Sequence, residues 1–214
     1  MTATSTLQPT RAEPRLTAKG EATRARIVEI AAELIIAQGV AGTSIEDVQR
    51  AAGVSASQLY HYFGDKRGLV HAVIEFQADA ILINQRLRTD RLDSFEALQA
   101  WRDRLVAAQD RRGCLGGCAI GSLASELADS QPDAREHLVN AFARWEAPIS
   151  EGLRAMRDRG ELRADADPDG LAVALLAAVE GGALLTRTRR ETKPLEIALD
   201  TMIGHIRSLS TAAG

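Results

Sequence analysis

Hydrophobic residues recur every three or four positions along most of the chain, and no run alternates strictly between apolar and polar residues. This periodicity is that of amphipathic helices, whereas a half-buried strand alternates with a period of two. We therefore predict an all-α fold with about nine helices. Residues 1–18 are rich in Thr, Ala and Pro and lack periodicity, so we expect a flexible N-terminal arm.

Three helices are predicted before residue 64. The first carries an apolar stripe from Ile27 to Ile35, and Gly39 is its expected stop. Thr43 and Glu46 fit a capping box, in which two side chains satisfy backbone N–H groups at a helix start; this second helix ends near Ala52. A second capping box, Ser55 to Gln58, opens a third helix of about two turns.

Six further helices are predicted from apolar stripes and proline or cap signals. Their ranges are Asp65 to Leu87, Asp93 to Leu105, Cys114 to Ala128, Ser130 to Met156, a helix starting at Asp167-Pro168, and Pro194 to Leu209.

The second and third helices are joined by Gly-Val-Ser at 53–55, which is the spacing of a helix-turn-helix. In that motif the second helix enters the major groove of DNA and the first crosses the backbone. Short polar side chains near the start of the third helix are suited to base edges, and tyrosine hydroxyls to phosphate oxygens. We predict that Ser57, Gln58 and His61 contact bases, and that Tyr60, Tyr62 and Lys66 contact phosphates.

The same region resembles the tetracycline-repressor (TetR) family of transcriptional regulators over residues 20–75. The motifs that carry the resemblance are Thr43 to Val48, Ala51 to Ser55, Leu59 to Phe63 and Lys66 to Leu69, in this order and closely spaced. The resemblance implies a three-helix DNA-binding head, a larger helical ligand-binding body, and a two-fold dimer formed mostly by the last two helices. It also implies phosphate contacts by Thr43 and Ser55. The alternative interpretation of the stretch is a generic helical hairpin with a solvated polar face.

With this organisation the chain divides into an arm at 1–18, a head at 19–66 and a ligand-binding and dimerisation body at 67–214. The body stripes contain both tryptophans and both cysteines of the chain. We expect a hydrophobic ligand there, with plain core packing as the alternative for each residue. The candidate ligand-binding residues are Phe76, Trp101, Cys114, Cys118, Phe142, Trp145 and Ile149.

The glycine-rich stretch from Gly113 to Cys118 allows several interpretations. No Gly-Lys-Ser/Thr follows it, which excludes a phosphate loop, and a zinc site would need further ligands. If both cysteines are helical, their spacing of four places them on one face. Buried cysteines usually act as small hydrophobic residues. Some members of the TetR family carry Gly-Cys here and respond to electrophiles, so the resemblance also implies a thiol sensor.

The helix from Pro168 carries Leu171 to Val179, which is apolar around its whole circumference and must be covered on all sides. We expect a second subunit to cover one side, making a two-fold interface; a helix buried within a monomer is the alternative. Glu180 ends this run and points either into the pocket or into the interface. The candidate interface residues are Ala172, Ala178, Gly181, Gly182, Leu195, Leu199, Met202 and Ile206.

The formal net charge is −3, which argues against a protein that coats nucleic acid with its whole surface. Residues 1–28 carry five basic and two acidic side chains, so an anionic partner is expected at that end. The longest apolar run, nine residues, is shorter than the roughly 20 residues of a membrane span, and no secretory signal is evident. We expect a cytoplasmic protein without cofactor or metal.

These observations predict a ligand-responsive homodimeric regulator rather than an enzyme. We expect a repressor that a small hydrophobic or electrophilic molecule releases from a near-palindromic DNA operator. The alternatives are an activator of the same fold, an architectural DNA protein, or an all-helical enzyme using the body cavity. No nucleophile–base pair, metal-ligand cluster or cofactor fingerprint in the sequence supports an enzyme.

Overall fold

The computed structural model describes residues 16–85, 87 and 90–211. Within these ranges the chain forms nine helices and one isolated antiparallel bridge, between Leu162 and Ser210. The all-α prediction is confirmed. The helices are α1 (Ala18–Gly42), α2 (Ile45–Ala52), α3 (Ala56–Phe63), α4 (Lys66–Asn84), α5 (Phe95–Arg111), α6 (Ala119–Leu127), α7 (Pro132–Asp158), α8 (Pro168–Arg189) and α9 (Lys193–Ser208).

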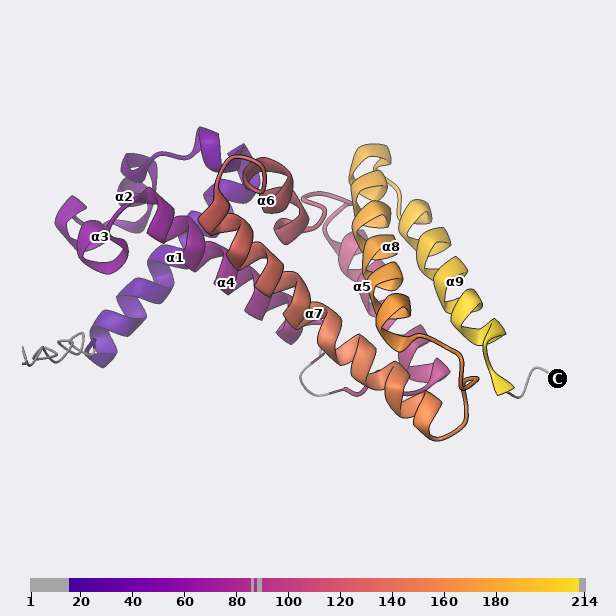
Figure 1. Cartoon of the computed structure of the whole chain (residues 1–214). Helices are drawn as coiled ribbons and strands as arrows, with labels where there is room; N and C mark the ends of the chain where they lie inside the picture. Colours follow the sequence, from indigo (N-terminus) through magenta and orange to yellow (C-terminus); the bar gives the residue numbers. More distant parts are fainter. Residues whose placement is uncertain (1–15, 86, 88–89, 212–214) are drawn as a thin grey trace, which may run out of the picture.

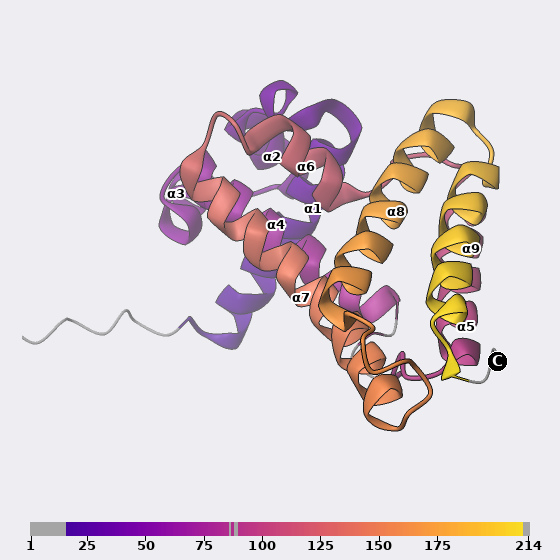
Figure 2. The same cartoon turned by 45° about the vertical axis from the view of Figure 1, so that its right-hand side comes forward.

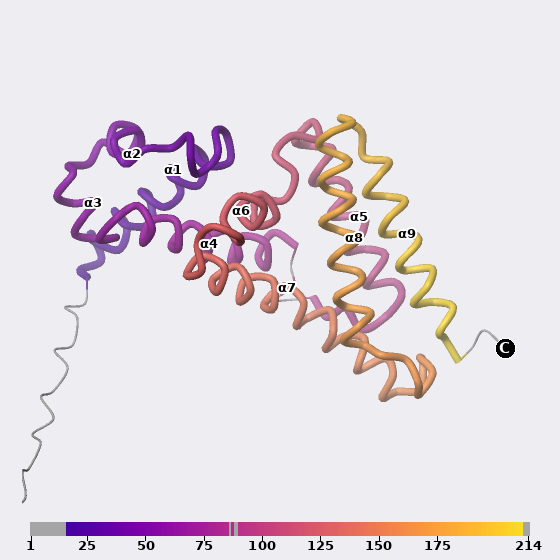
Figure 3. The backbone as a smooth tube through the Cα atoms, turned by 45° about the horizontal axis from the view of Figure 1, so that its top comes forward, coloured from indigo at the N-terminus to yellow at the C-terminus, as the bar shows by residue number. Residues whose placement is uncertain are grey.

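The molecule is elongated, with α2 and α3 at one end and α5, α8 and α9 at the other (Figures 1 and 2). Helices α4 and α7 run between the two ends and pack against each other. The tube view shows α5, α8 and α9 side by side (Figure 3), and α9 packs against both of the other two helices. Helix α4 begins at Lys66, shortly after α3 ends at Phe63, and extends into the body.

Buried side chains form two cores. The first is built by α1 to α4 together with α6 and the start of α7; the second by α5, α8, α9, the rest of α7 and Leu82 near the end of α4. Ile81, Cys118 and Phe142 pack against both cores. Because these three side chains come from α4, from the residue before α6, and from α7, the two cores meet at the place where those elements approach one another.

Capping of the first short helices differs from the prediction at one of two places. The box at Ser55 and Gln58 is confirmed. The box before α2 is formed by Ser44 and Asp47, not by Thr43 and Glu46. Thr43 still belongs to the end of α1, where its hydroxyl donates to the Gly39 carbonyl and its N–H to Val40, so the next residue takes the capping position.

The predicted helix from Cys114 to Ala128 is wrong in its first part. Here α6 begins at Ala119, and the Cys118 thiol caps it by accepting a hydrogen bond from Gly121 N–H at 3.4 Å. Cys114 lies in the left-handed region (φ 58°) together with three of the neighbouring glycines. The glycine run therefore forms a loop, and the two cysteines do not share a helical face.

The predicted arm lies mostly outside the described residues, which begin at residue 16; α1 starts at Ala18 with Thr17 as its cap. Within the described part of the chain, α8 alone is long and apolar enough by composition to cross a membrane. A core helix of a soluble protein meets the same criterion. In this structure α8 packs against α7 and α9, and nine of its residues are buried.

Candidate nucleic-acid interface and effector cavities

The turn between α2 and α3 has the geometry of a helix-turn-helix. Gly53 ends α2 in the left-handed conformation (φ 61°), which glycine adopts without steric cost. Leu59 and Phe63 then anchor α3, being 2% and 9% exposed. The opposite face of α3 is consequently presented to solvent at the far end of the molecule (Figure 1). The exposed residues include Ser55, Ser57, Gln58, Tyr60 and His61.

On this face the oxygen and the nitrogen of the Gln58 side-chain amide have different roles. Its Oε1 accepts a hydrogen bond from Ser55 N–H at 3.0 Å, as part of the capping box. The amide oxygen is thus engaged in holding the start of α3, and Nε2 is the group that Gln58 offers to a partner. The hydroxyls of Ser55 and Ser57 lie 2.9 Å apart.

The three aromatic rings of α3 are divided between surface and interior. Tyr60 is 54% exposed, whereas Tyr62 is half-buried and packs at the edge of the Phe63 ring, with centroids 6.1 Å apart. The Arg24 guanidinium of α1 lies 5.3 Å from the centroid of Phe63, a cation–π contact that ties α3 to α1. Only Tyr60 among the three is therefore fully available to a partner.

Two residues that were predicted to contact phosphates make hydrogen bonds within the protein instead. Thr43 is 2% exposed, and the prediction that it contacts DNA does not fit this burial. Lys66 is half-buried, and its Nζ donates to the Val40 carbonyl at 2.7 Å. Lys66 thereby connects the start of α4 to the end of α1.

The same short segment of α1 is held by the body. Gly39 leaves the helical conformation (φ 79°), and the following residues Val40 and Ala41 donate their N–H groups to the Glu126 carboxylate of α6, at 2.9 and 2.6 Å. Val40 is therefore bonded to α6 through its N–H and to α4 through its carbonyl. We call these contacts of Glu126 the junction clasp.

A cavity of about 630 Å³ lies within the body, between α4, α5, α7 and α8; we call it the body cavity. Gln85, at the end of α4, lies in its wall and accepts hydrogen bonds from both indoles: Trp101 Nε1 at 2.9 Å and Trp145 Nε1 at 3.0 Å. Cys118 and Trp145 line the cavity directly, while Trp101 is fully buried behind Gln85.

The other predicted ligand-binding residues do not line this cavity. Ile149 is fully buried in the body core, Cys114 is buried beside the glycine loop, and Phe142 packs between the two cores. Phe76 is 37% exposed. The apolar periodicity of the sequence indicated which residues face inward. It did not distinguish residues that fill the core from residues that border a cavity.

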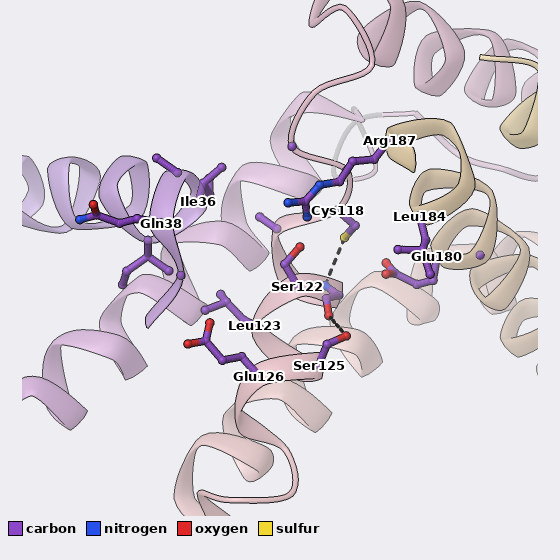
Figure 4. A pocket seen from close by; sticks show the side chains of 18 residues that line it. Ile36, Gln38, Cys118, Ser122, Leu123, Ser125, Glu126, Glu180, Leu184 and Arg187 are labelled. Carbon is purple, nitrogen blue, oxygen red and sulfur yellow. Dashed lines mark hydrogen bonds between the residues drawn. The ribbon is translucent and has the colours of Figure 1, made fainter. Parts of the chain in front are cut away.

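A second cavity, of about 650 Å³, lies between α1, α6 and α8; we call it the junction cavity. Figure 4 shows Ile36 and Gln38 of α1 on one side, Ser122 and Glu126 of α6 below, and Glu180 of α8 opposite. Cys118 lines both cavities.

Burial raises the pKa of the Cys118 thiol well above its usual value, and the adjacent Glu180 carboxylate raises it further. Because the thiolate is the nucleophilic form, this environment keeps Cys118 in its unreactive state. The pKa of Glu180 is itself raised by burial, an effect that the hydrogen bond from the Cys118 thiol partly offsets.

Comparisons with known proteins agree with this geometry. The family described as "Bacterial regulatory proteins, tetR family" matches residues 27–73, and "Tetracyclin repressor-like, C-terminal domain" matches residues 94–202, about half of the chain. The chain belongs to the TetR family. Among its relatives is the HTH-type transcriptional repressor DhaR of a Mycobacterium strain, 27% identical over 81% of this chain and 86% of DhaR.

Other matches to TetR-family proteins extend over nearly the whole chain. The transcriptional regulator AcuR of Cereibacter sphaeroides is 26% identical over 88% of this chain and 87% of AcuR. A crystal structure of a TetR regulator from Chloroflexus aurantiacus is 29% identical, covers 91% of this chain and 98% of that one, and has a TM-score of 0.77. Head and body thus both have the TetR-family fold.

In this TetR-family subunit, most predicted interface residues are already buried within one chain. Gly182 packs directly on Leu195, which joins α8 to α9. The group buried in this way comprises Ala172, Gly182, Leu195, Leu199 and Ile206; Ala178 and Met202 are half-buried and only Gly181 is exposed. The exposed residues on one side of α8 overlap with the predicted set only at Gly181. This exposed stripe consists of Val173, Ala177, Gly181, Leu184 and Leu185, and Ile197 of α9 is exposed as well.

The stripe has a helical signal that was available in the sequence. Its members recur at spacings of four, four, three and one residues, which places them on one side of a helix. The periodicity was hidden because Leu171 to Val179 is apolar on every side.

Proposed function

We propose that this TetR-family chain is a ligand-responsive transcriptional repressor that works as a homodimer in the cytoplasm. The observation that carries the proposal is the α3 face: its apolar side is anchored by Leu59 and Phe63, and its polar side is exposed at the end of the molecule. We propose base contacts by Ser57, Gln58 and His61, and phosphate contacts by Ser55, Tyr60, Tyr62 and, after release from Val40, Lys66.

A dimer is needed for this activity because two heads must reach successive major grooves of a near-palindromic operator, about 34–36 Å apart. We propose that the exposed stripe of α8, with Ile197, forms the two-fold interface. Ala177 and Gly181 lie in the middle of the stripe, where small residues allow two helices to approach closely. Four apolar side chains surround them, and burying these would stabilise the dimer.

We propose the body cavity as the effector site. Helix α4 contributes Gln77, Ala80, Ile81 and Asn84 to its wall, and the same helix begins at Lys66 beside α3. A helix of 19 residues is about 28 Å long and moves as a unit. An effector with different affinities for two α4 positions would therefore change the separation of the heads and release the operator. With this division the head is 19–66 and the body 67–214.

A gel shift with DNA from upstream of the gene, compared with random DNA at rising salt, tests the proposal. We expect a preference for the upstream DNA, and an affinity about tenfold lower for His61→Ala, as expected for a lost base contact. His205→Ala, an exposed histidine of α9, is the matched control and should bind like the wild type. Equal binding to random DNA would contradict the proposal. Increased transcription when the gene is deleted would support a repressor over an activator.

A further inference from the structure

Glu180 is an acidic side chain within the apolar part of α8. It turns toward α6, where its Oε1 is buried and has no hydrogen-bond partner among the described residues. The carboxyl also interacts with the thiol of Cys118. A buried carboxyl with an unsatisfied oxygen is unfavourable for folding, and an apolar side chain of the same size would be more stable there.

Helix α6 makes room for this carboxyl. A Cβ atom added to Gly121 would lie 2.0 Å from Glu180 Oε2 and 3.1 Å from Cδ. Gly121 has ordinary helical conformation, so its backbone does not require glycine, and glycine inside a helix costs about 1 kcal/mol relative to alanine. Glycine at this position therefore leaves space for the Glu180 carboxyl as it lies in this structure.

The carboxyl borders the junction cavity, whose walls are otherwise mainly apolar (Figure 4). Among the described lining residues the charged side chains are Glu126, Glu180 and Arg187. Both oxygens of Glu126 are engaged in the junction clasp. Of these two acidic groups, Glu180 is therefore the one with an oxygen that has no hydrogen-bond partner among the described residues.

We propose that the junction cavity binds a small apolar molecule carrying a protonated amine, and that Glu180 is the residue that selects it. A rotation of the Glu180 carboxyl that brings the buried Oε1 to the cavity would let an ammonium group supply the donor that this oxygen lacks, and the charge-assisted hydrogen bond offsets the cost of burying the carboxylate. Ile35, Ile36 and Leu123 provide apolar surface for the rest of the molecule. This site adjoins the body cavity at Cys118 but has its own lining from α1 and α6, and it requires no change in the effector proposed for the body cavity.

Such a molecule would bear directly on the head. The cavity wall includes α1 from Ile35 to Gly39, immediately before the segment that the junction clasp holds. An amine bound here would contact α1, α6 and α8 together. The junction cavity thus offers a second route by which a small molecule influences the position of the DNA-binding end.

Three probes with the same ring test the selection: benzylamine, benzyl alcohol and benzoate. Binding to the full chain is followed by the NMR signal of the Gly121 amide, which lies beside the carboxyl. We expect benzylamine to bind about tenfold or more tightly than the other two probes. In Glu180→Gln this preference should disappear. Glu151→Gln, at an exposed position of α7, is the matched control and should keep it.

A second variant, Ser122→Leu, fills the cavity from an exposed position of α6 without altering the carboxyl, and it should weaken benzylamine binding at Gly121. Equal affinity for benzylamine and benzyl alcohol, an amine preference that survives Glu180→Gln, or unchanged binding in Ser122→Leu would each overturn the proposal. The measurement needs no operator, so its outcome is independent of whether the chain represses transcription.

Discussion

At the residue scale, Gln85 accepts hydrogen bonds from both tryptophans of the chain, from Trp101 on α5 and Trp145 on α7. Buried indole N–H groups need an acceptor, and a single amide oxygen serves both. Gln85 also stands at the C-terminal end of α4. It therefore fixes α4, α5 and α7 relative to one another at the wall of the body cavity.

Gln85→Leu should leave two buried indole N–H groups without an acceptor and reduce the free energy of unfolding by about 2–4 kcal/mol. Urea unfolding measures this loss. Tryptophan emission should change as well, because all indole fluorescence of the chain comes from this place. Gln77 lines the same cavity, and Gln77→Leu is the control, for which we expect little change in unfolding free energy or emission. An unaltered emission spectrum in Gln85→Leu would contradict the arrangement.

Cys118 illustrates how surroundings decide reactivity. Because burial and then Glu180 raise the pKa of this thiol, it should react with iodoacetamide at neutral pH far more slowly than the same thiol in unfolded protein. Mass spectrometry of peptides separates Cys118 from Cys114. Rapid labelling of Cys118 in the folded protein would contradict this prediction and would favour the thiol-sensor interpretation.

Several important side chains were predictable from the sequence and others were not. The exposed residues of α3, and Cys118 and Trp145 at the body cavity, were identified from helical periodicity and motif spacing. Gln85 and Glu126 were missed. Their partners lie far away along the chain, 60 residues for Trp145 and 86 for Val40, and no local pattern records such contacts.

At the element scale, α4 and α7 are joined by polar contacts as well as by apolar packing, since Arg144 of α7 bonds both Glu75 and Asp79 of α4. His71 of α4 stacks on His137 of α7 with ring centroids 4.4 Å apart, and His137 in turn bonds Glu75 at 3.0 Å. Burial lowers the pKa of His71, and the nearby His137 lowers it further. Folding consequently favours the neutral form of His71.

The sign of the pH effect follows from this lowered pKa. Below its usual value of 6.5, His71 binds a proton more readily in the unfolded chain than in the folded one, so its contribution to stability is lost as the pH falls. When the pH is lowered from about 7.5 to about 5.5, the free energy of unfolding of His71→Gln should therefore decrease by less than that of the wild type. Urea unfolding at both pH values measures this. His205→Gln, at an exposed position, should behave like the wild type.

The helical elements were predicted well where a cap or proline adjoins a periodic stripe, as at Pro132, Pro168 and Ser55. The predicted helix was wrong between Cys114 and Cys118. The apolar pattern continues through these residues, but their backbone is not helical. Four of the residues from Gly113 to Gly117 have positive φ, and three of these four are glycine. Composition alone did not distinguish a glycine-rich helix start from a loop.

At the scale of the whole molecule, the proposed dimer depends on the exposed stripe of α8. Leu184 is 62% exposed, and a glutamate there would place a charge in the proposed two-fold interface. Leu184→Glu should be monomeric by light scattering and should lose operator binding. Val139→Glu, at a position of α7 that is 61% exposed, is the matched control and should stay dimeric. A dimeric Leu184→Glu would exclude this interface.

The junction clasp is the second feature at this scale, since it joins α6 of the body to the end of α1. Glu126→Ala removes the acceptor of the Val40 and Ala41 N–H groups. Hydrogen exchange of these two amides should become faster, while the amides in the middle of α1 stay protected. Glu136→Ala, an exposed glutamate of α7, is the control. Unchanged exchange at Val40 would contradict the contact.

The sharing of Ile81, Cys118 and Phe142 between two cores has a consequence for how this chain can be divided. Leu123 and Leu127 of α6 and Leu138 of α7 complete the interior of the head, although they lie more than fifty residues beyond its last short helix. A fragment ending after α3 would leave that interior uncovered. The part of the chain up to the end of α3 is therefore not an autonomous folding unit. In a regulator that exchanged its sensor part with a relative, these three leucines of α6 and α7 would have to be exchanged together with that part.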